Sequence, residues 1–406
     1  MWPWRLLGDL SQRSWHRVEQ RLSDPALYPK LRSNWLTRWV TRRRTARLYD
    51  LMGGFANTQV LVACVRLGLL DALAKSGLTA SELANQLRVP GPRLMPLLQA
   101  CESMGLIKTT PDGRFALSSL AWPIVSHPGI KVMLEHNQLL YEDLLAPEQF
   151  LRHRGGRMHD FWPYVEGQGE GQGETKRKVG GEATQASERY SEVMDASQVF
   201  VIEEVLASHD FSRHQCVMDV GCGMGRLISR IGLAHPHLKL KLFDLPSVVS
   251  LAAHRLDQAG LSGRYACHAG SFKTDDLPRG ADLITLVRIG HDHSDAVCRD
   301  LIRKAWEALP EGGQLLIAEP MAATELNRNL ASAYFHMYLL AMGDGRLRTP
   351  NDYIEMLKEA GFASVRTVKT GLPIHAQVIL ATKQGFTPVF NSRSKDRLTH
   401  INVNKK

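Results

Sequence analysis

The sequence has no long hydrophobic run. No window of the 406-residue chain approaches the roughly 18 uninterrupted apolar residues that a transmembrane helix needs, so we expect no membrane-spanning helix. The opening residues Trp2-Pro-Trp-Arg-Leu-Leu7 are followed at once by polar residues, so we expect no secretory signal peptide. Together with the scattered cysteines described next, which suggest reduced thiols, these features lead us to expect a cytoplasmic protein.

Cysteine is scarce and scattered. The chain contains no C-x-x-C motif and no His/Cys spacing of the kind that binds zinc. We expect reduced thiols and no disulfide framework. No cluster of Asp, Asn and Glu suggests a magnesium site, so we expect a metal-independent protein. The six cysteines are Cys64, Cys101, Cys216, Cys222, Cys267 and Cys298.

Positive charge and tryptophan are concentrated at the N-terminus. Residues 1–50 contain ten arginines and one lysine against four acidic residues, and five of the eight tryptophans. Interleaved Arg and Trp suit an anionic membrane surface, so residues 1–44 are interpreted as a leader that supports peripheral membrane association. A basic leader that packs on a dimer partner and a nucleic-acid contact are the alternatives.

Residues 45–165 have the pattern of a small helical domain. Apolar residues at helical spacing over 45–75 predict one or two buried helices, with a soft point at Gly53-Gly54. Thr79 and Glu82 form a capping box that begins the next helix. Pro92 begins another helix, and residues 107–117 form a hairpin around Asp112-Gly113. Helix, helix, hairpin is the order of a winged helix.

A winged helix raises a hypothesis from a different functional class, a DNA-binding regulator. A helix that reads the major groove needs side chains that reach base edges and phosphates. The helix that begins at Pro92, which would be the recognition helix, offers only Arg93 and Glu102 as charged residues. We therefore favour dimerisation over DNA binding and expect a homodimer.

The C-terminal half alternates strands and helices. Residues 166–186 are a Gly-rich linker, residues 187–383 form the larger domain, and residues 384–406 are a polar tail. The alternation predicts a seven-stranded parallel sheet covered on both faces, a Rossmann-like α/β fold. The strands are expected at 216–220, 238–243, 264–269, 282–287, 313–318, 364–369 and 376–382.

The first of these strands ends in a turn rich in glycine. Asp219 comes before Gly221, Gly223 and Gly225, and Arg226 stands where a dinucleotide fingerprint would have its last glycine. The next strand ends at Asp244. Its separation along the sequence from the glycine turn is about that of the acid that binds ribose hydroxyls in nucleotide-binding folds. This combination resembles a class I S-adenosylmethionine-dependent methyltransferase. A glycine turn in some other α/β domain is the alternative.

A possible acid–base pair follows two later strands. His291 follows the strand expected at 282–287, and Glu319 ends the strand expected at 313–318. If the two strands are neighbours, both side chains emerge beside the glycine turn. An imidazole can take a proton from a hydroxyl, and a carboxylate behind it stabilises the imidazolium that forms.

Residues 45–383 resemble the two-domain O-methyltransferases with an N-terminal winged-helix dimerisation domain, the group of plant phenol and animal hydroxyindole enzymes. The resemblance implies that His291 is the general base, with Asp292 beside it and Glu319 as its orienter. It implies S-adenosyl-L-methionine as the cofactor. The residues implied to bind it are Asp219, Gly221, Gly223, Gly225, Asp244, Leu245, Ser271, Phe272 and Arg288.

Further motifs resemble one bacterial branch of this family, the carotenoid O-methyltransferases of purple phototrophic bacteria. They are Leu286-Val-Arg288, His291-Asp-His293, Ala318-Glu-Pro-Met321 and Arg348-Thr-Pro350. This resemblance implies methylation of the tertiary 1-hydroxyl of acyclic carotenoids, such as demethylspheroidene to spheroidene or hydroxyneurosporene to its methoxy product. A phenolic or polyketide acceptor is the alternative.

Two positions depart from the family pattern. Many relatives have Gly-Asp-Phe after the third strand, where this chain has Gly270-Ser271-Phe272, and Leu347 falls near the position of a second glutamate of the plant enzymes.

A long polyene substrate needs an apolar and adaptable channel, which methionine side chains suit. The candidates to line it are Met133, Tyr141, Phe161, Trp162, Met194, Phe335, Tyr338 and Met342, although each one alone is more simply a core residue.

Overall fold

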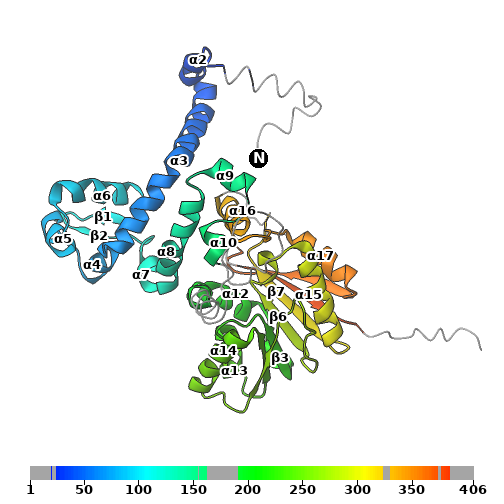
Figure 1. The fold of residues 1–406 in the computed structure, drawn as a ribbon. Coiled ribbons are helices and arrows are strands. Elements are labelled where there is room, and N and C mark those ends of the chain that lie inside the picture. Colours follow the sequence, from blue (N-terminus) through cyan, green and yellow to red (C-terminus); the bar gives the residue numbers. More distant parts are fainter. Residues whose placement is uncertain are drawn as a thin grey trace, which may run out of the picture. The chain divides into compact units, whose positions relative to one another are not determined.

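The computed structural model describes residues 20, 24–153, 155–161, 191–322, 330–373 and 376–384 (Figure 1). The chain divides into two compact units, Met1–His127 and Pro128–Lys406. The predicted linker 166–186, the first 19 residues of the predicted leader and the tail beyond residue 384 lie outside the described residues.

The first unit is mostly helical. Its elements are α2 (Tyr28–Ser33), α3 (Trp35–Arg66), α4 (Leu69–Lys75), α5 (Ala80–Leu87), α6 (Gly91–Ser103), β1 (Ile107–Thr109), β2 (Phe115–Leu117) and α7 (Trp122–Ser126). The predicted order of helix, helix and hairpin is present, and β1 and β2 pair antiparallel. The capping box is complete, because Thr79 Oγ1 accepts from the Glu82 N–H and Glu82 Oε2 accepts from the Thr79 N–H.

Helix α6 is built to be buried. Leu94, Leu98 and Cys101 have no exposed surface. Glu102 is occupied with the first strand of the hairpin, since its Oε1 accepts from the Thr109 N–H at 2.9 Å and from the Thr109 hydroxyl at 2.7 Å. Arg93 is the only cationic side chain of this helix. A helix that binds the major groove of DNA needs more groups that reach base edges and phosphates.

Helix α3 differs from its prediction in two ways. It runs without a break through Gly53-Gly54, because two glycines cost only about 1 kcal/mol each relative to alanine and the helix is 32 residues long. The apolar residues that were predicted to be buried also lie on the surface of the unit between residues 48 and 55. Leu48, Leu51, Met52 and Phe55 are each more than half exposed.

Among the described residues, no single helix is both long enough and apolar enough to cross a membrane. Residues Thr37–Arg66 and Leu69–Lys75 meet the length and composition requirements only as a pair bent by 59°. Core helices of soluble proteins meet the same requirements, so the pair is weak evidence for a span.

The second unit begins with helices and continues into a seven-stranded sheet. Its helices are α8 (Pro128–Asp143), α9 (Pro147–Arg152), α10 (Arg157–Phe161), α12 (Val199–Ser208), η2 (Phe211–Arg213), α13 (Arg226–Ala234), α14 (Pro246–Gln258), η3 (Gly290–Asp292), α15 (Asp295–Ala308), α16 (Leu330–Met342) and α17 (Pro350–Glu359). The sequence interpretation placed residues 128–165 in the first domain, whereas here α8, α9 and α10 belong to the second unit.

The sheet has the order β5-β4-β3-β6-β7-β9-β8. Its strands are β3 (Cys216–Val220), β4 (Lys239–Asp244), β5 (Tyr265–Ala269), β6 (Leu283–Val287), β7 (Gln314–Glu319), β8 (Ser364–Val368) and β9 (Gln377–Thr382). The prediction of a wholly parallel sheet was wrong at one edge, because β9 runs antiparallel to both β7 and β8. The connection between β8 and β9 contains no helix among its described residues, and a parallel pair would need a long crossover.

Successive residues of the central strands face opposite cores. Val217 packs in the core beneath α12, α13 and α14, and Met218 packs in the core beneath α15 and α17. The same alternation separates Leu283 from Ile284 and Leu316 from Leu315. With helices on both faces, the strands present their carboxyl ends as the accessible edge, which is where a ligand site is expected.

Candidate active site

Four parallel strands bring the candidate residues to one edge of the sheet. In the register, Val220 of β3 pairs with Phe243 of β4 and with Leu286 of β6, and Val287 pairs with Ala318 of β7. The glycine turn, Asp244, the loop after β6 and Glu319 therefore lie next to one another. The two strands predicted to carry His291 and Glu319 are direct neighbours.

The three glycines of the turn after β3 have left-handed backbones. Their φ angles are 68° at Gly221, 53° at Gly223 and 73° at Gly225, a region that residues with a Cβ rarely adopt. A Cβ at Gly221 would also collide with Cδ1 of Ile289. A Cβ at Gly223 would instead meet open space, so the backbone there can lie close to a ligand at this edge.

Two buried acids flank the turn. Asp219 Oδ1 accepts a hydrogen bond of 2.6 Å from the Thr285 hydroxyl, and burial raises the pKa of Asp219 to about 7. Asp244 accepts from two backbone N–H groups at 2.8 Å, Gly223 on Oδ2 and Leu245 on Oδ1, and burial raises its pKa to about 6. Each Asp244 oxygen keeps a lone pair that can accept from a ligand hydroxyl.

Arg226 has a structural partner of its own. Its side chain pairs with Asp195, a buried residue of the helical segment 191–197, and Arg255 of α14 pairs with the same carboxylate at 2.5 Å. The arginine in place of the last fingerprint glycine thus ties segment 191–197 to the start of α13 and to α14. Sequence reasoning registered the missing glycine but not this ion-pair triad.

His291 is buried between two carboxylates. Its Nε2 lies 3.2 Å from Asp292 Oδ1, and its Nδ1 lies 3.3 Å from Glu319 Oε2 without hydrogen-bonding geometry. Burial alone would lower the pKa of His291, but the charges of Asp292 and Glu319 outweigh it and raise the pKa to about 9. The imidazole is therefore held as a cation at neutral pH.

Glu319 is itself held by three donors. Its Oε1 accepts from the N–H groups of Gly290 at 2.6 Å and Ile289 at 3.2 Å, and its Oε2 accepts from the Tyr353 hydroxyl at 2.5 Å. Tyr353 and Glu319 are both almost fully buried. Sequence reasoning missed Tyr353, because an aromatic residue on the apolar face of a helix is ordinarily core.

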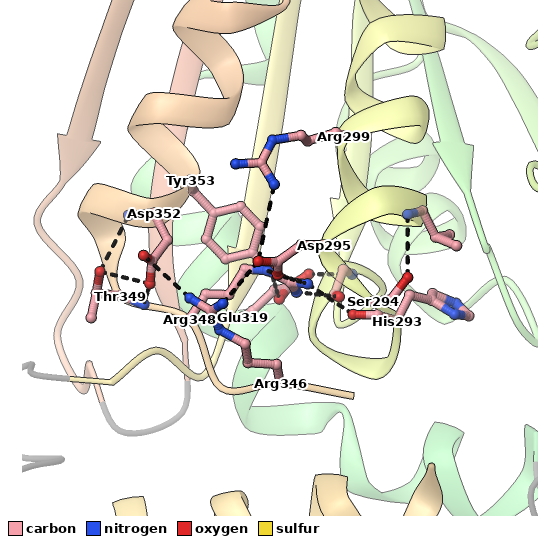
Figure 2. A network of polar contacts seen from close by, with 12 residues as sticks. His293, Ser294, Asp295, Arg299, Glu319, Arg346, Arg348, Thr349, Asp352 and Tyr353 are labelled. Atoms are coloured by element: carbon pink, nitrogen blue, oxygen red, sulfur yellow. Dashed lines mark hydrogen bonds and ion pairs between the residues drawn. The ribbon is translucent and has the colours of Figure 1, made fainter. Parts of the chain in front are cut away.

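Arg348 fixes the short helix η3 from behind. It has no exposed surface and donates to the carbonyl oxygens of Gly290 at 2.6 Å and His293 at 2.8 Å. It also donates to Asp295 Oδ1 at 2.7 and 3.0 Å, and its guanidinium lies over the ring of Tyr353 (Figure 2). The sequence offered Arg348 only as part of a motif, with no role attached.

The other residues implied by the family resemblance lie around the same edge. The Ser271 N–H donates to Asp275 Oδ2 at 2.8 Å, and the ring of Phe272 packs edge-on against His293 at 5.2 Å. Burial lowers the pKa of His293 to about 4, so this imidazole is neutral. Arg288 has a left-handed backbone and donates to Ser197 Oγ at 2.6 Å.

An apolar cluster in the same unit joins α8, α10, α16 and segment 191–197. Six of the eight candidate channel residues belong to it: Met133, Phe161, Met194, Phe335, Tyr338 and Met342. Trp162 lies outside the described residues, and Tyr141 is not part of the cluster. Two polar pairs are set within it, His136 with the Tyr338 hydroxyl at 3.0 Å and Tyr334 with Asn137 at 2.9 Å. Leu347 is buried in the same cluster.

No group of three or more His, Cys, Asp and Glu side chains within the described part of the chain is arranged to hold a metal ion.

Two family models match the chain. An O-methyltransferase domain matches residues 151–363, and an O-methyltransferase dimerisation domain matches residues 49–126. Each model falls largely within one of the two compact units.

Individual relatives are similar over nearly their full lengths. A demethylspheroidene O-methyltransferase of Cereibacter sphaeroides is 35% identical over 86% of this chain and 90% of its own length. One from Rhodobacter capsulatus is 36% identical over 85% of this chain and 84% of its own. The crystal structure of human N-acetylserotonin methyltransferase in complex with S-adenosylmethionine is 25% identical, with a TM-score of 0.66 over 84% of this chain and 98% of the human one.

Proposed function

Since the chain belongs to the O-methyltransferase family and is an S-adenosylmethionine-dependent enzyme, we propose that its acceptor is the tertiary 1-hydroxyl of an acyclic carotenoid. Demethylspheroidene and hydroxyneurosporene are the substrates this proposal names. The observation that carries it is the similarity of about 85% of the chain to two demethylspheroidene O-methyltransferases. The apolar, Met-rich cluster beside the site supports it, because a polyene offers no polar groups for recognition.

The residues at the sheet edge fit S-adenosylmethionine. The left-handed glycines leave open space beside the backbone at Gly223, which a side chain there would enter, and Asp244 keeps lone pairs for ribose hydroxyls. Bound there, S-adenosylmethionine supplies an electrophilic methyl group. Leu245, at the start of α14, and Ser271, in the loop after β5, lie at the same edge.

His291 is the general base of the proposal. A tertiary alcohol does not ionise in advance, so its proton must leave as the oxygen attacks, and a base in hydrogen-bond reach is required. With a pKa of about 9, the imidazole must first lose its own proton. The pKa of His291 would fall with S-adenosylmethionine bound nearby, because the positive charge of its sulfonium disfavours the imidazolium.

Asp292 and Glu319 then stabilise the imidazolium that forms when His291 takes the acceptor proton. The two carboxylates lie within 3.3 Å of opposite nitrogens of the ring, so the positive charge is met on both sides. Tyr353 and the backbone N–H groups of η3 keep Glu319 in place, and Arg348 keeps η3 in place.

Methyl transfer from labelled S-adenosylmethionine to detergent-dispersed 1-hydroxy carotenoids, beside a panel of phenols, tests the proposal. We expect labelled carotenoid and a loss of about 10²- to 10⁴-fold in kcat for His291→Asn, the range that a general base contributes. His293→Asn is the matched control, because His293 is also buried and lies two residues away. Cofactor binding measured by calorimetry shows that both variants are folded.

Each result has a different meaning. Product that survives in His291→Asn but is lost in His293→Asn would move the base to His293. Labelled phenols without labelled carotenoid would replace the acceptor and leave the O-methyltransferase assignment intact.

A further inference from the structure

The N-terminal part of α3, residues 35–47, carries large aromatic side chains on its surface. Trp35 is 80% exposed and Trp39 is 59% exposed. In the first unit, Figure 1 shows this part of α3 extending beyond the packed group of α4, α5 and α6, with α2 at its far end. The helix thus presents two indole rings that the unit itself does not cover.

These tryptophans share a face with arginines. At about 100° per residue, Trp35, Trp39, Arg38, Arg42 and Arg43 fall on one side of the helix. The guanidinium of Arg43 lies 5.4 Å from the centre of the Trp39 ring. We call these five residues the Trp/Arg face.

The opposite side of the same segment is already in use. Thr37 and Thr41 are partly buried, and the Thr37 hydroxyl donates to the Leu31 carbonyl at 2.6 Å, which ties α2 to α3. Packing of α2 therefore does not account for the Trp/Arg face.

The charge of the segment selects an anionic partner. Residues 25–49 contain six arginines and one lysine and no acidic residue. Exposed indoles beside guanidiniums match the interface of a bilayer with negative headgroups, where the rings sit at headgroup level and the cations meet phosphates.

A second copy of the chain fits a different side of α3. The exposed residues Leu48, Leu51, Met52 and Phe55 have helical spacing, and Phe55 lies about 200° around the axis from Trp35. The matched dimerisation domain begins at residue 49, so it includes most of this apolar stripe and none of the Trp/Arg face.

We propose that the Trp/Arg face of α3 binds an anionic lipid surface and holds the enzyme peripherally on a membrane. The helix lies along the surface with its indoles in the headgroup layer. Binding of this kind combines buried apolar area with electrostatic attraction, so it needs both residue types.

Flotation of the full-length protein with vesicles tests this directly. One vesicle set is phosphatidylcholine alone and the other is phosphatidylcholine mixed with phosphatidylglycerol. We expect binding to the mixed vesicles only, with a blue shift of tryptophan emission. Arg42→Gln with Arg43→Gln should weaken binding about thirtyfold, which is about fivefold for each cation at about 1 kcal/mol.

Trp35→Ser with Trp39→Ser should abolish the part of the binding that survives high salt. The matched control replaces one exposed tryptophan and one exposed arginine elsewhere in the first unit, Trp122→Ser with Arg93→Gln, and should bind like the wild type. Methyl transfer to detergent-dispersed substrate should be unchanged in all three variants.

Three results would overturn the proposal. They are equal loss of vesicle binding in the control, dissociation of the Trp35/Trp39 variant into monomers, and binding to duplex DNA in place of vesicles that is lost in the Arg42/Arg43 variant. The vesicle experiment contains no acceptor, so its outcome is independent of the proposed carotenoid chemistry.

Discussion

The charge of His291 is set by two residues that touch it. Asp292 and Glu319 raise its pKa to about 9 against the opposing effect of burial. A base must be neutral to act, so if His291 is the base, the carboxylates that stabilise its imidazolium also set the pH at which the enzyme becomes active.

Glu319→Gln should shift the pH profile to lower pH. If His291 is the base, kcat rises with pH until the imidazole loses its proton, and removing the Glu319 charge lowers that pKa. The maximal rate should also fall, because the imidazolium loses one of its two partners. The measurement is kcat against pH, and Glu311→Gln on an exposed turn is the control. An unshifted profile would remove Glu319 from the proton chemistry.

The pH dependence of stability is a second measure of the charge of His291. The pKa of His291 in the folded protein lies above its ordinary value of 6.5, so its contribution is complete below that pH and is lost as pH rises through about 9. The difference in unfolding free energy between the wild type and His291→Asn should therefore shrink between these two pH values.

Arg348→Lys should cost about 2–4 kcal/mol of stability and lower kcat more than it raises the KM for S-adenosylmethionine. Lysine keeps the charge but cannot donate at once to Gly290, His293 and Asp295, so buried acceptors lose their partner. Chemical denaturation and steady-state kinetics measure the two effects. Arg299→Lys is the matched control, since the ion pair of the half-exposed Arg299 is screened by solvent and its replacement is expected to change stability little. Equal losses in both variants would contradict the role of Arg348 in holding η3 in place.

At the scale of elements, the glycine turn must satisfy two demands, backbone conformation and helix packing. Gly223 and Gly225 both have left-handed backbones. A Cβ at Gly223 would meet open space, whereas one at Gly225 would lie 3.0 Å from Ala252 Cβ and 3.2 Å from its Cα. The two positions therefore separate strain from packing.

Gly225→Ala should destabilise the protein by about 1–3 kcal/mol more than Gly223→Ala does. Both variants carry the left-handed penalty of about 1–2 kcal/mol, and only the first forces α13 away from the rigid backbone of α14. Urea denaturation of the two variants side by side measures the difference. Equal losses would mean that the turn, and not the packing of α13 on α14, sets the need for glycine.

The elements were predictable where periodicity is strong. All seven strands of the large sheet were predicted to within one residue at either end, because apolar runs between turn residues have few other readings. The antiparallel β9 was not predicted, since strand patterns carry no direction. In α3 the helical period was correct, but a period does not reveal whether an apolar stripe meets its own unit or another molecule.

The candidate site was predictable only where a residue ends a strand or closely follows one. His291, Glu319 and Asp244 could be placed together because parallel strands end at the same edge. Tyr353 and Arg348 reach Glu319 and η3 from α17 and the loop before it, and only the tertiary packing of α17 brings them there. Asp195 was hidden for the same reason, since its two arginines come from α13 and α14.

At the scale of the whole molecule, α3 carries two exposed faces of different chemistry. Three of the four residues of the apolar stripe, Leu51, Met52 and Phe55, lie within the matched dimerisation domain, which supports a homodimer. Four large apolar side chains at helical spacing would be costly to leave in water. The Trp/Arg face is positively charged. In a symmetric dimer that met through this face, the two copies would place positive charges opposite each other.

Leu51→Lys with Met52→Lys should therefore convert the dimer into monomers. The two lysines place like charges where the stripes of two copies would meet, and burying them without partners costs several kcal/mol. Analytical ultracentrifugation over a range of concentrations measures the change, and Trp35→Ser with Trp39→Ser should remain dimeric. A Leu51/Met52 variant that stays dimeric would place the interface elsewhere in the first unit. Loss of the dimer in both variants would instead make the whole exposed length of α3 one interface between copies, and the membrane proposal would fail with it.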